Sequence, residues 1–361
     1  MGEFFTMKKL LFVLGTRPEG IKMCPLILEA RSRKDEFSVM VCNTGQHREL
    51  LDSVFELFQV KPDYNLNSMI PNQTLCYSLS TILSALRTII REESTDYVVV
   101  QGDTTSTLAG ALAGYYNKIP VVHLEAGLRS GDIYSPFPEE GNRKMVSQIA
   151  DIHFCSTKYN ADTLHREGTQ SNVYVVGNTG LDALEHTLKI IPTKTVFDGN
   201  TVLLTLHRRE SFDSGIYKIF DVINTLTVKH GVYVRFPVHP NPTLGKIVNE
   251  YLIPDSHLFI WPPLNYRDFV TAIQHSDLIL TDSGGVQEEA PFIGVPTIVL
   301  REKTERMETV NSGSSFLLGY DTETIIRTSL ELLSRKHRMD RDLSYGDGKS
   351  SGRICDILKS T

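Results

Sequence analysis

Short apolar runs alternate with stretches of helical hydrophobic spacing along the whole chain. In the first half, the runs that we expect to form strands are 8–14, 38–42, 97–101, 120–124, 152–155 and 173–176. The stretches that we expect to form helices are 18–33, 46–58, 73–91, 104–116, 139–149 and 157–167. Alternation of this kind predicts an α/β fold in which helices cover both faces of a parallel sheet.

The same pattern restarts in the second half. Its expected strands are 201–206, 232–237, 257–261, 277–281 and 296–300, and its expected helices are 216–229, 242–250, 265–275, 284–293 and 321–334. Lys189–Asn200 between the halves combines a proline with polar residues and a glycine, which is typical of a linker. We therefore predict two doubly wound, Rossmann-like domains, 7–188 and 200–345, with ligand sites at the carboxyl ends of their strands. If these ends face each other, the ligand lies in a cleft between the domains.

Length and charge narrow the class of protein. The chain has 361 residues, which suits two domains, and a net charge of −6 without any Lys/Arg-rich tract, which argues against nucleic acid as a partner. No apolar run approaches the roughly 20 residues that span a bilayer, and we find no signal peptide, so we expect a cytoplasmic protein without membrane attachment. Met1–Thr6 formally matches a myristoylation pattern, but Met7 looks like the native start.

Cofactor and metal motifs are absent from the sequence. The five cysteines are scattered and include no C-x-x-C pair, which argues for a reducing compartment and against a disulfide framework or zinc site. The eleven histidines include no H-E-x-x-H pair. Neither a G-x-G-x-x-G after the first strand nor a P-loop motif occurs, which argues against NAD(P) bound in the usual way and against a P-loop NTPase. We therefore expect no metal and no cofactor.

A candidate diphosphate site follows the apolar run 278–280. Ser283, Gly284 and Gly285 form a glycine turn before a helix, and the backbone N–H groups at such a helix start favour an anion. Glu288 and Glu289 follow within a turn and can accept hydrogen bonds from sugar hydroxyls. The alternative is a capped helix after a core strand.

A second candidate anion site lies where the first strand ends. Thr16 and Glu19 fit a capping box, and Pro18 lies in the first helical turn. Arg17 is then a cation at a helix N-terminus, which is unfavourable unless an anion accompanies it. Lys22 follows on the same helix. The alternative for Arg17 is an ion pair with a surface carboxylate, but its place against the helix dipole favours anion binding.

Carboxylates follow two of the expected strands and open one of the expected helices. Asp103 comes after strand 97–101 and Glu125 after strand 120–124, which are the positions where α/β folds place chemistry. Glu139 and Glu140 begin a helix after a proline-rich segment. Three carboxylate sites in successive loops favour a catalytic role.

Each carboxylate also has a structural alternative. Asp103 can cap the following helix, although Thr104 can take that role instead, and Glu125 can pair with Arg129 one turn on. The two glutamates at 139 and 140 can balance the dipole of their helix.

Basic residues occupy matching strand ends in the second half. His207 and Arg208 follow strand 201–206, and His239 follows strand 232–237. A lone histidine is more often structural, but two at equivalent strand ends beside an arginine suit phosphate binding or proton transfer.

These motifs, in this order, closely resemble the bacterial, non-hydrolysing UDP-N-acetylglucosamine 2-epimerases. The segments that carry the resemblance are 15–19, 101–104, 123–129, 138–140, 207–210 and 282–289. The resemblance implies two domains of glycosyltransferase-B type and a C-terminal segment, 346–361, that returns to the first domain as a helix around Ser350 to Ser360. It also implies a UDP-sugar as substrate, and we expect a homodimer.

The resemblance assigns roles residue by residue. The positions that match nucleotide-binding residues are Arg17, Lys22, Phe269, Ser283, Gly284, Gly285, Glu289 and Arg306. Among these, Glu289 would hold the ribose hydroxyls and Phe269 would pack near the uracil. The positions that match catalytic residues are Asp103, Glu125, Glu139 and His207. To these we add Arg208 and His239 as candidate substrate-binding residues from their places at strand ends.

The implied reaction is reversible inversion at carbon 2 of the sugar, supplying activated N-acetylmannosamine for surface polysaccharide. No carbonyl acidifies the hydrogen at carbon 2, and a carboxylate with a pKa of roughly 4 cannot remove it directly at a useful rate. The bond to UDP must therefore break first, which leaves a glycal and UDP that later recombine. Three alternatives remain open: a hydrolysing epimerase that releases the free sugar, a glycosyltransferase of the same fold, and a nucleotide-sugar sensor.

Some relatives bind a second UDP-N-acetylglucosamine as an activator, through an arginine and glutamines. In this chain Asn72 stands at the arginine position and Glu49 at a glutamine position. Because an arginine offers several charged donors and a glutamate repels phosphates, we expect this activator site to be weak or absent.

Overall fold

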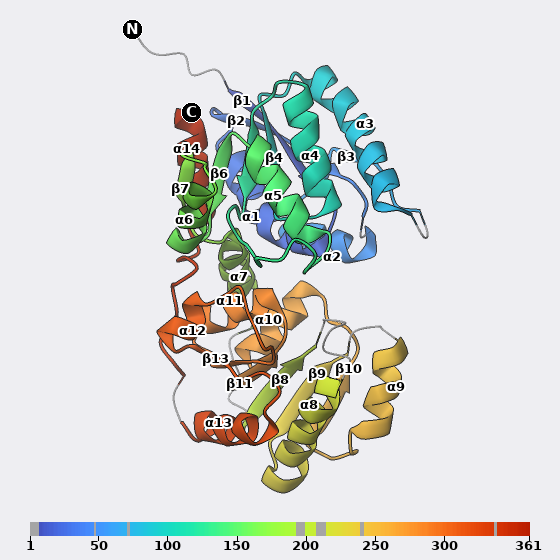
Figure 1. Ribbon diagram of the computed structural model, residues 1–361, viewed down its shortest axis with the longest axis vertical. Helices are drawn as coiled ribbons and strands as arrows, with labels where there is room; N and C mark the ends of the chain where they lie inside the picture. Colours follow the sequence, from blue (N-terminus) through green and yellow to red (C-terminus); the bar gives the residue numbers. More distant parts are fainter. Residues whose placement is uncertain are drawn as a thin grey trace. The chain divides into compact units, whose positions relative to one another are not determined.

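The computed structural model describes residues 7–46, 48–70, 73–192, 199–206, 214–238, 242–335 and 338–361, without the side chains at 48, 49, 214 and 242. The chain divides into two compact units (Figure 1). The first comprises the described residues up to His186 together with Tyr345–Thr361, and the second comprises Thr187–Ser344. Each unit has its own sheet, so we describe them separately.

The first unit is built on one parallel sheet in the order β3-β2-β1-β4-β5-β6-β7. Its strands are Lys8–Leu14 (β1), Phe37–Asn43 (β2), Tyr64–Asn65 (β3), Tyr97–Gln101 (β4), Val121–Leu124 (β5), Ile152–Cys155 (β6) and Val173–Val175 (β7). Its helices are Arg17–Ser32 (α1), Arg48–Phe58 (α2), Leu75–Glu93 (α3), Thr105–Tyr116 (α4), Glu139–Ile149 (α5), Lys158–Arg166 (α6), most of Thr179–Ile190 (α7) and Ser350–Ser360 (α14). The central strands read as near-continuous apolar runs because helices cover both faces of the sheet.

Close packing fixes α4 on the sheet. A side chain at Gly110 would meet Val100 and Val13, and one at Gly114 would meet Val121. The two glycines therefore let this helix approach strands β1, β4 and β5, and its N-terminus lies where β4 ends. Helices α3 and α5 flank α4 on the same face (Figure 1).

The C-terminal helix α14 belongs to the first unit and packs on α1. Arg33 Nη1 lies 2.5 Å from Asp356 Oδ1, and the ammonium of Lys8 donates to the carbonyl of Leu358 at 2.7 Å. The buried carboxylate of Asp182 accepts the backbone N–H groups of Ser350 and Ser351 at 3.1 and 2.7 Å. This helix is therefore held by contacts at its start and along its length.

The second unit repeats the architecture with a parallel sheet in the order β10-β9-β8-β11-β12-β13. Its strands are Thr201–Thr205 (β8), Tyr233–Pro237 (β9), Leu258–Trp261 (β10), Leu278–Thr281 (β11), Thr297–Val299 (β12) and Ser315–Leu317 (β13). Its helices are Ser214–Asn224 (α8), Pro242–Tyr251 (α9), Tyr266–Gln274 (α10), Gly284–Phe292 (α11), Glu308–Ser312 (α12) and Thr322–Ser334 (α13). The predicted fold class, an α/β chain with two parallel sheets, is thus confirmed.

Four elements were not predicted from the sequence pattern: β3, β13, α7 and α12. Two other expectations need correction. Helix α7 extends into the predicted linker as far as Ile190, and α8 ends at Asn224, after which Thr225–Lys229 forms a π-helical turn. None of the described helices is both long and apolar enough to cross a membrane.

Candidate functional site

The carboxyl edge of the first sheet gathers the loops after β1, β4 and β5. These three strands are parallel neighbours in the sheet, so their carboxyl ends meet at one edge. Arg17 begins α1 after β1, Asp103 follows β4, and Glu125 follows β5. The fold therefore brings together three residues that lie far apart in the sequence.

The loop after β1 has the local structure that the sequence predicts. Thr16 caps α1, Pro18 lies in its first turn, and the carboxylate of Glu19 accepts the backbone N–H of Thr16 at 2.7 Å. Arg17 is half-buried as the first residue of the helix. The expected capping box is thus confirmed, and it fixes the point at which Arg17 leaves the backbone.

Glu125 combines an uncommon backbone conformation with polar contacts to both of its carboxylate oxygens. Its φ of 62° lies in the left-handed region, which a residue with a side chain occupies only when the surroundings impose it. Its Oε1 atom lies 2.5 Å from Nζ of Lys22, and Oε2 accepts a hydrogen bond from the amide of Gln101. The alternative that Glu125 pairs with Arg129 is wrong, because Arg129 binds Glu167 at 2.7 Å.

Asp103 is held by two residues of helix α5. Its Oδ2 atom lies 2.6 Å from Nη2 of Arg143, and its carbonyl accepts the amide of Asn142 at 2.8 Å. It does not cap α4, because Thr104 does so by accepting the N–H of Thr107 at 3.2 Å. The capping alternative for Asp103 is therefore wrong, and its carboxylate is available for another role.

Arg143 forms ion pairs with two acidic residues, Asp103 and Glu140. Its Nη1 atom lies 3.1 Å from Oε2 of Glu140, whose side chain is fully buried. Burial works to lower the pKa of this guanidinium, but Asp103 and Glu140 outweigh it and raise the pKa above its usual value. Arg143 thus keeps its charge and orients Asp103.

Glu139 opens α5 one turn before Arg143. Residues four apart share one face of a helix, so Glu139 lies on the face that carries the contact with Asp103. Its Oε2 atom is buried and has no hydrogen-bond partner among the described residues. A buried carboxylate oxygen without a donor is costly and is uncommon in proteins, so this atom is a candidate for contact with a ligand or a proton.

His123, on β5, is buried beneath this edge. Its Nε2 atom lies 2.8 Å from the carbonyl oxygen of Gly102, next to Asp103. Burial lowers its pKa to about 3, so the ring is neutral at ordinary pH and donates this hydrogen bond. His123, Arg143 and Gln101 were not predicted as site residues, although all three lie in or near segments that carry the family resemblance.

The second unit carries the predicted diphosphate site after β11. Ser283 precedes α11, and its N–H donates to the hydroxyl of Thr281 at 2.9 Å. Its own hydroxyl accepts no capping hydrogen bond from the described backbone. The expected strand, glycine turn and helix start are therefore present, and a capping role does not explain this serine.

Arg306 packs directly against the start of α11. A side chain carbon at Gly284 would lie 2.6 Å from Cζ of Arg306, so only glycine leaves room for the guanidinium there. Arg306 is buried, with its Nε atom 2.8 Å from Oε1 of Glu288 and a further ion pair to Glu305. The structure thus brings three predicted nucleotide-binding residues, Ser283, Gly284 and Arg306, into one place.

Phe269 lies on α10 and Glu289 lies on α11. The hydroxyl of Tyr266 donates to Oε1 of Glu289 at 2.8 Å, and Phe269 is half-buried one turn further along the same helix as Tyr266. The predicted residues His207, Arg208 and His239 lie outside the described residues, as do Asn72 and the side chain of Glu49.

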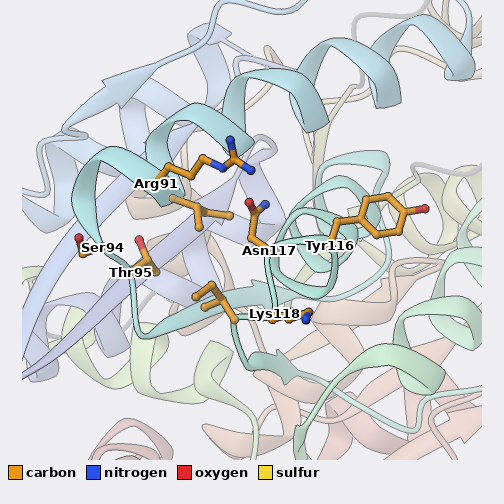
Figure 2. Close-up of a pocket in the computed structure, with 8 residues that line it drawn as sticks. Arg91, Ser94, Thr95, Tyr116, Asn117 and Lys118 are labelled. Carbon is orange, nitrogen blue, oxygen red and sulfur yellow. The ribbon is translucent and has the colours of Figure 1, made fainter.

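A separate hollow lies at the opposite edge of the first sheet, at the amino ends of β4 and β5. Its volume is about 340 Å³, and Figure 2 shows the side chains around it. It is lined by Ile90, Arg91, Ser94, Thr95, Tyr116, Asn117, Lys118 and Ile119. None of the candidate site residues lies there.

The comparison with known proteins agrees with these observations. The sequence profile of the family described as UDP-N-acetylglucosamine 2-epimerase matches residues 29–359. The chain belongs to this family. It is therefore an enzyme of the isomerase class, as the resemblance implies. A UDP-N-acetylglucosamine 2-epimerase of Yersinia pestis is 42% identical over 98% of both chains, and that of Escherichia coli K12 is 41% identical over the same shares.

Solved structures of this family are similar over the same length. The UDP-GlcNAc 2-epimerase of Neisseria meningitidis bound to UDP-GlcNAc has a TM-score of 0.90 and 39% identity, covering 98% of this chain and 100% of that one. The Methanocaldococcus jannaschii enzyme in complex with UDP-GlcNAc and UDP has a TM-score of 0.82 and 35% identity, with the same coverage. A spinosyn rhamnosyltransferase, 11% identical with a TM-score of 0.55, shows that the fold is shared with a glycosyltransferase.

Proposed function

We propose that this epimerase interconverts UDP-N-acetylglucosamine and UDP-N-acetylmannosamine without hydrolysis, by elimination and re-addition of UDP. The proposal rests on the presence, in one chain, of a candidate diphosphate site and of carboxylates suited to catalysis. The second unit has a helix start and a buried arginine suited to a diphosphate, and the first has three carboxylates where strands end or a helix begins.

We assign UDP binding to residues of the second unit and, from the sequence resemblance alone, to Arg17. The N–H groups at the start of α11 and the guanidinium of Arg306 would face the diphosphate, and Glu289 would accept the ribose hydroxyls. Donors aimed at a diphosphate stabilise the charge that develops when the bond to the sugar breaks. His207, Arg208 and His239 join this assignment from the sequence.

In the first half of the reaction, the bond between carbon 1 and the phosphate oxygen breaks, and UDP leaves with the electron pair. The resulting oxocarbenium-like centre acidifies the hydrogen at carbon 2. A carboxylate takes that proton, and a double bond forms between carbons 1 and 2. In the second half, a proton adds to carbon 2 from the opposite face, and a phosphate oxygen of UDP attacks carbon 1.

The environments of the three carboxylates suggest different roles. Asp103 is paired with Arg143, so we assign it to stabilising the cationic centre. Glu139 has a buried oxygen without a donor among the described residues, so we assign it to proton transfer on one face. Glu125 is held by Lys22 and Gln101 in a strained backbone, and we assign it to the other face.

The fate of the products tests this proposal against a hydrolysing enzyme. Anion-exchange chromatography of the reaction mixture separates UDP-sugars from free sugar and UDP. We expect UDP-N-acetylmannosamine to accumulate to an equilibrium ratio that is the same from either substrate. Free N-acetylmannosamine with a matching amount of UDP as the only products would show hydrolysis instead.

We further infer a cytoplasmic homodimer that supplies activated N-acetylmannosamine for surface polysaccharide. All five cysteines are free thiols and four of them are buried, which agrees with a reducing compartment. Tyr77, Tyr115 and Tyr116 expose large aromatic side chains on α3 and α4, which suits a protein interface. Light scattering of the purified protein would give twice the chain mass if the dimer forms.

A further inference from the structure

Glu19 lies completely inside the first unit, beneath two loops of the carboxyl edge. Its side chain is 1% exposed. Its Oε2 atom accepts the backbone N–H groups of Gly15 and Thr16 at 2.8 and 2.7 Å. Its Oε1 atom accepts the hydroxyl of Thr104 at 2.6 Å and lies 3.0 Å from that of Thr107. One carboxylate therefore binds the loop after β1 with one oxygen and the start of α4 with the other.

A helix cap alone does not require this second set of bonds. At α6, Thr157 and Asn160 form a capping box with an amide in place of the carboxylate. In α1 the capping function uses only Oε2 of Glu19. Burial raises the pKa of Glu19, while the hydrogen bonds from Thr104, Gly15, Thr16 and Thr107 work to lower it. Donors from both loops thus offset part of the cost of burying this carboxylate.

The two loops that Glu19 joins carry two groups of the proposed reaction. Thr16 directly precedes Arg17, and Thr104 directly follows Asp103. A further buried contact reinforces the same region, since the hydroxyls of Thr44 and Ser106 lie 2.7 Å apart beside Gly15. The two loops are therefore joined by polar contacts that are buried or, at Thr104, partly buried.

We propose that Glu19 is a positioning residue that couples the Arg17 loop to the Asp103 loop, so that UDP binding and stabilisation of the cationic centre depend on the same buried carboxylate. The proposal rests on the proposed function for the roles of Arg17 and Asp103. It assigns to Glu19 no contact with the substrate.

The contacts of Glu19 with the two loops form a bridge between them. The sharpest probe is Thr104→Val, which removes one hydroxyl of this bridge and keeps the shape of the side chain. Thr104 lies on the Asp103 side, so without coupling the change would affect turnover alone. We expect the Kd for UDP to rise roughly 5-fold or more, the lower range for coupled sites, together with a fall in kcat. Glu19→Gln, which keeps the size but not the charge, should do the same.

The matched control is Thr157→Val, which removes the same kind of cap at α6 and leaves the bridge intact. It should lower the Tm by a similar amount without changing the Kd for UDP. If Glu19 and Thr104 act through one bridge, the double variant Glu19→Gln/Thr104→Val should lose no more UDP affinity than the worse single variant.

Two measurements distinguish failure of the proposed coupling from failure of the proposed reaction. They are isothermal titration with UDP and the exchange of deuterium into carbon 2. An unchanged Kd in folded Thr104→Val would overturn the coupling and leave the proposed reaction untouched. Wild-type protein that binds UDP but exchanges no deuterium would overturn the reaction, while the titrations still decide the coupling. If Glu19→Gln does not fold, as judged by near-ultraviolet circular dichroism, Thr104→Val decides alone.

Discussion

Nζ of Lys22 lies 2.5 Å from Oε1 of Glu125, which joins the second turn of α1 to the end of β5. The resemblance to known epimerases places Lys22 among the nucleotide-binding residues, but this contact places its charge on a proposed catalytic carboxylate. The pair is mostly buried, with 15% and 13% of the two side chains exposed, so its attraction is screened less than that of a surface pair.

For Lys22→Met we therefore expect kcat to fall by about tenfold or more, because Glu125 loses the charged partner of its Oε1 atom. The Kd for UDP should change by less than about threefold. Steady-state kinetics and calorimetry with UDP measure the two quantities. A Kd that rises more than kcat falls would return Lys22 to the nucleotide site.

The three carboxylates should be required for turnover more than for binding. General acid–base groups typically contribute about 10²- to 10⁴-fold, and an electrostatic stabiliser contributes about 10²- to 10³-fold. We therefore expect losses of this order in kcat for Glu125→Gln and Glu139→Gln, and for Asp103→Asn. The Kd for UDP should stay near that of the wild type, because none of these three carboxylates is assigned to UDP binding. A variant with normal turnover would remove its residue from the reaction.

A side chain at Gly284 should displace the guanidinium of Arg306 and weaken UDP binding. In Gly284→Ala the new carbon would lie 2.6 Å from Cζ of Arg306, so the guanidinium must leave the start of α11. We expect the Kd for UDP to rise by about tenfold or more, which corresponds to about 1.4 kcal/mol. Gly245→Ala is the control, because a side chain there meets nothing within 4 Å. Equal affinity in the two variants would contradict the placement of the diphosphate beside Arg306.

His123 should make the protein less stable in mild acid. Burial lowers its pKa from 6.5 to about 3, so below pH 6.5 the unfolded chain binds a proton that the folded chain excludes. Stability then falls as the pH drops through this range, by up to about 2 kcal/mol between pH 6.5 and 5. Urea unfolding at pH 7.5 and 5 should show a smaller loss for His123→Gln than for wild type. The same loss in both would show that His123 does not carry this dependence.

Local features of the site were predictable because they depend on neighbouring residues. The capping box of Thr16 and Glu19, the role of Thr104 as a possible cap, and the glycine turn at Ser283 all follow from spacing within one turn of helix. The long strands followed from apolar runs. By contrast, β3 and β13 are too short to give a periodic signal, and α12 spans only Glu308–Ser312.

Long-range pairing could not be predicted in the same way. The contacts of Lys22 with Glu125 and of Arg143 with Asp103 depend on the order β1-β4-β5 and on where α5 packs, which no local pattern specifies. The sequence suggested Arg129 as the partner of Glu125 because it is near in the chain. The fold provides Lys22 instead, from a helix about a hundred residues earlier.

The most direct test of the proposed reaction is proton NMR of UDP-N-acetylglucosamine incubated with the protein in heavy water. Elimination and re-addition exchanges the hydrogen at carbon 2 with solvent while the sugar stays attached to UDP. We predict that deuterium appears at carbon 2 in both UDP-N-acetylglucosamine and UDP-N-acetylmannosamine, without added NAD or metal. Epimerisation that retains the original hydrogen at carbon 2, or release of free sugar alone, would contradict the account.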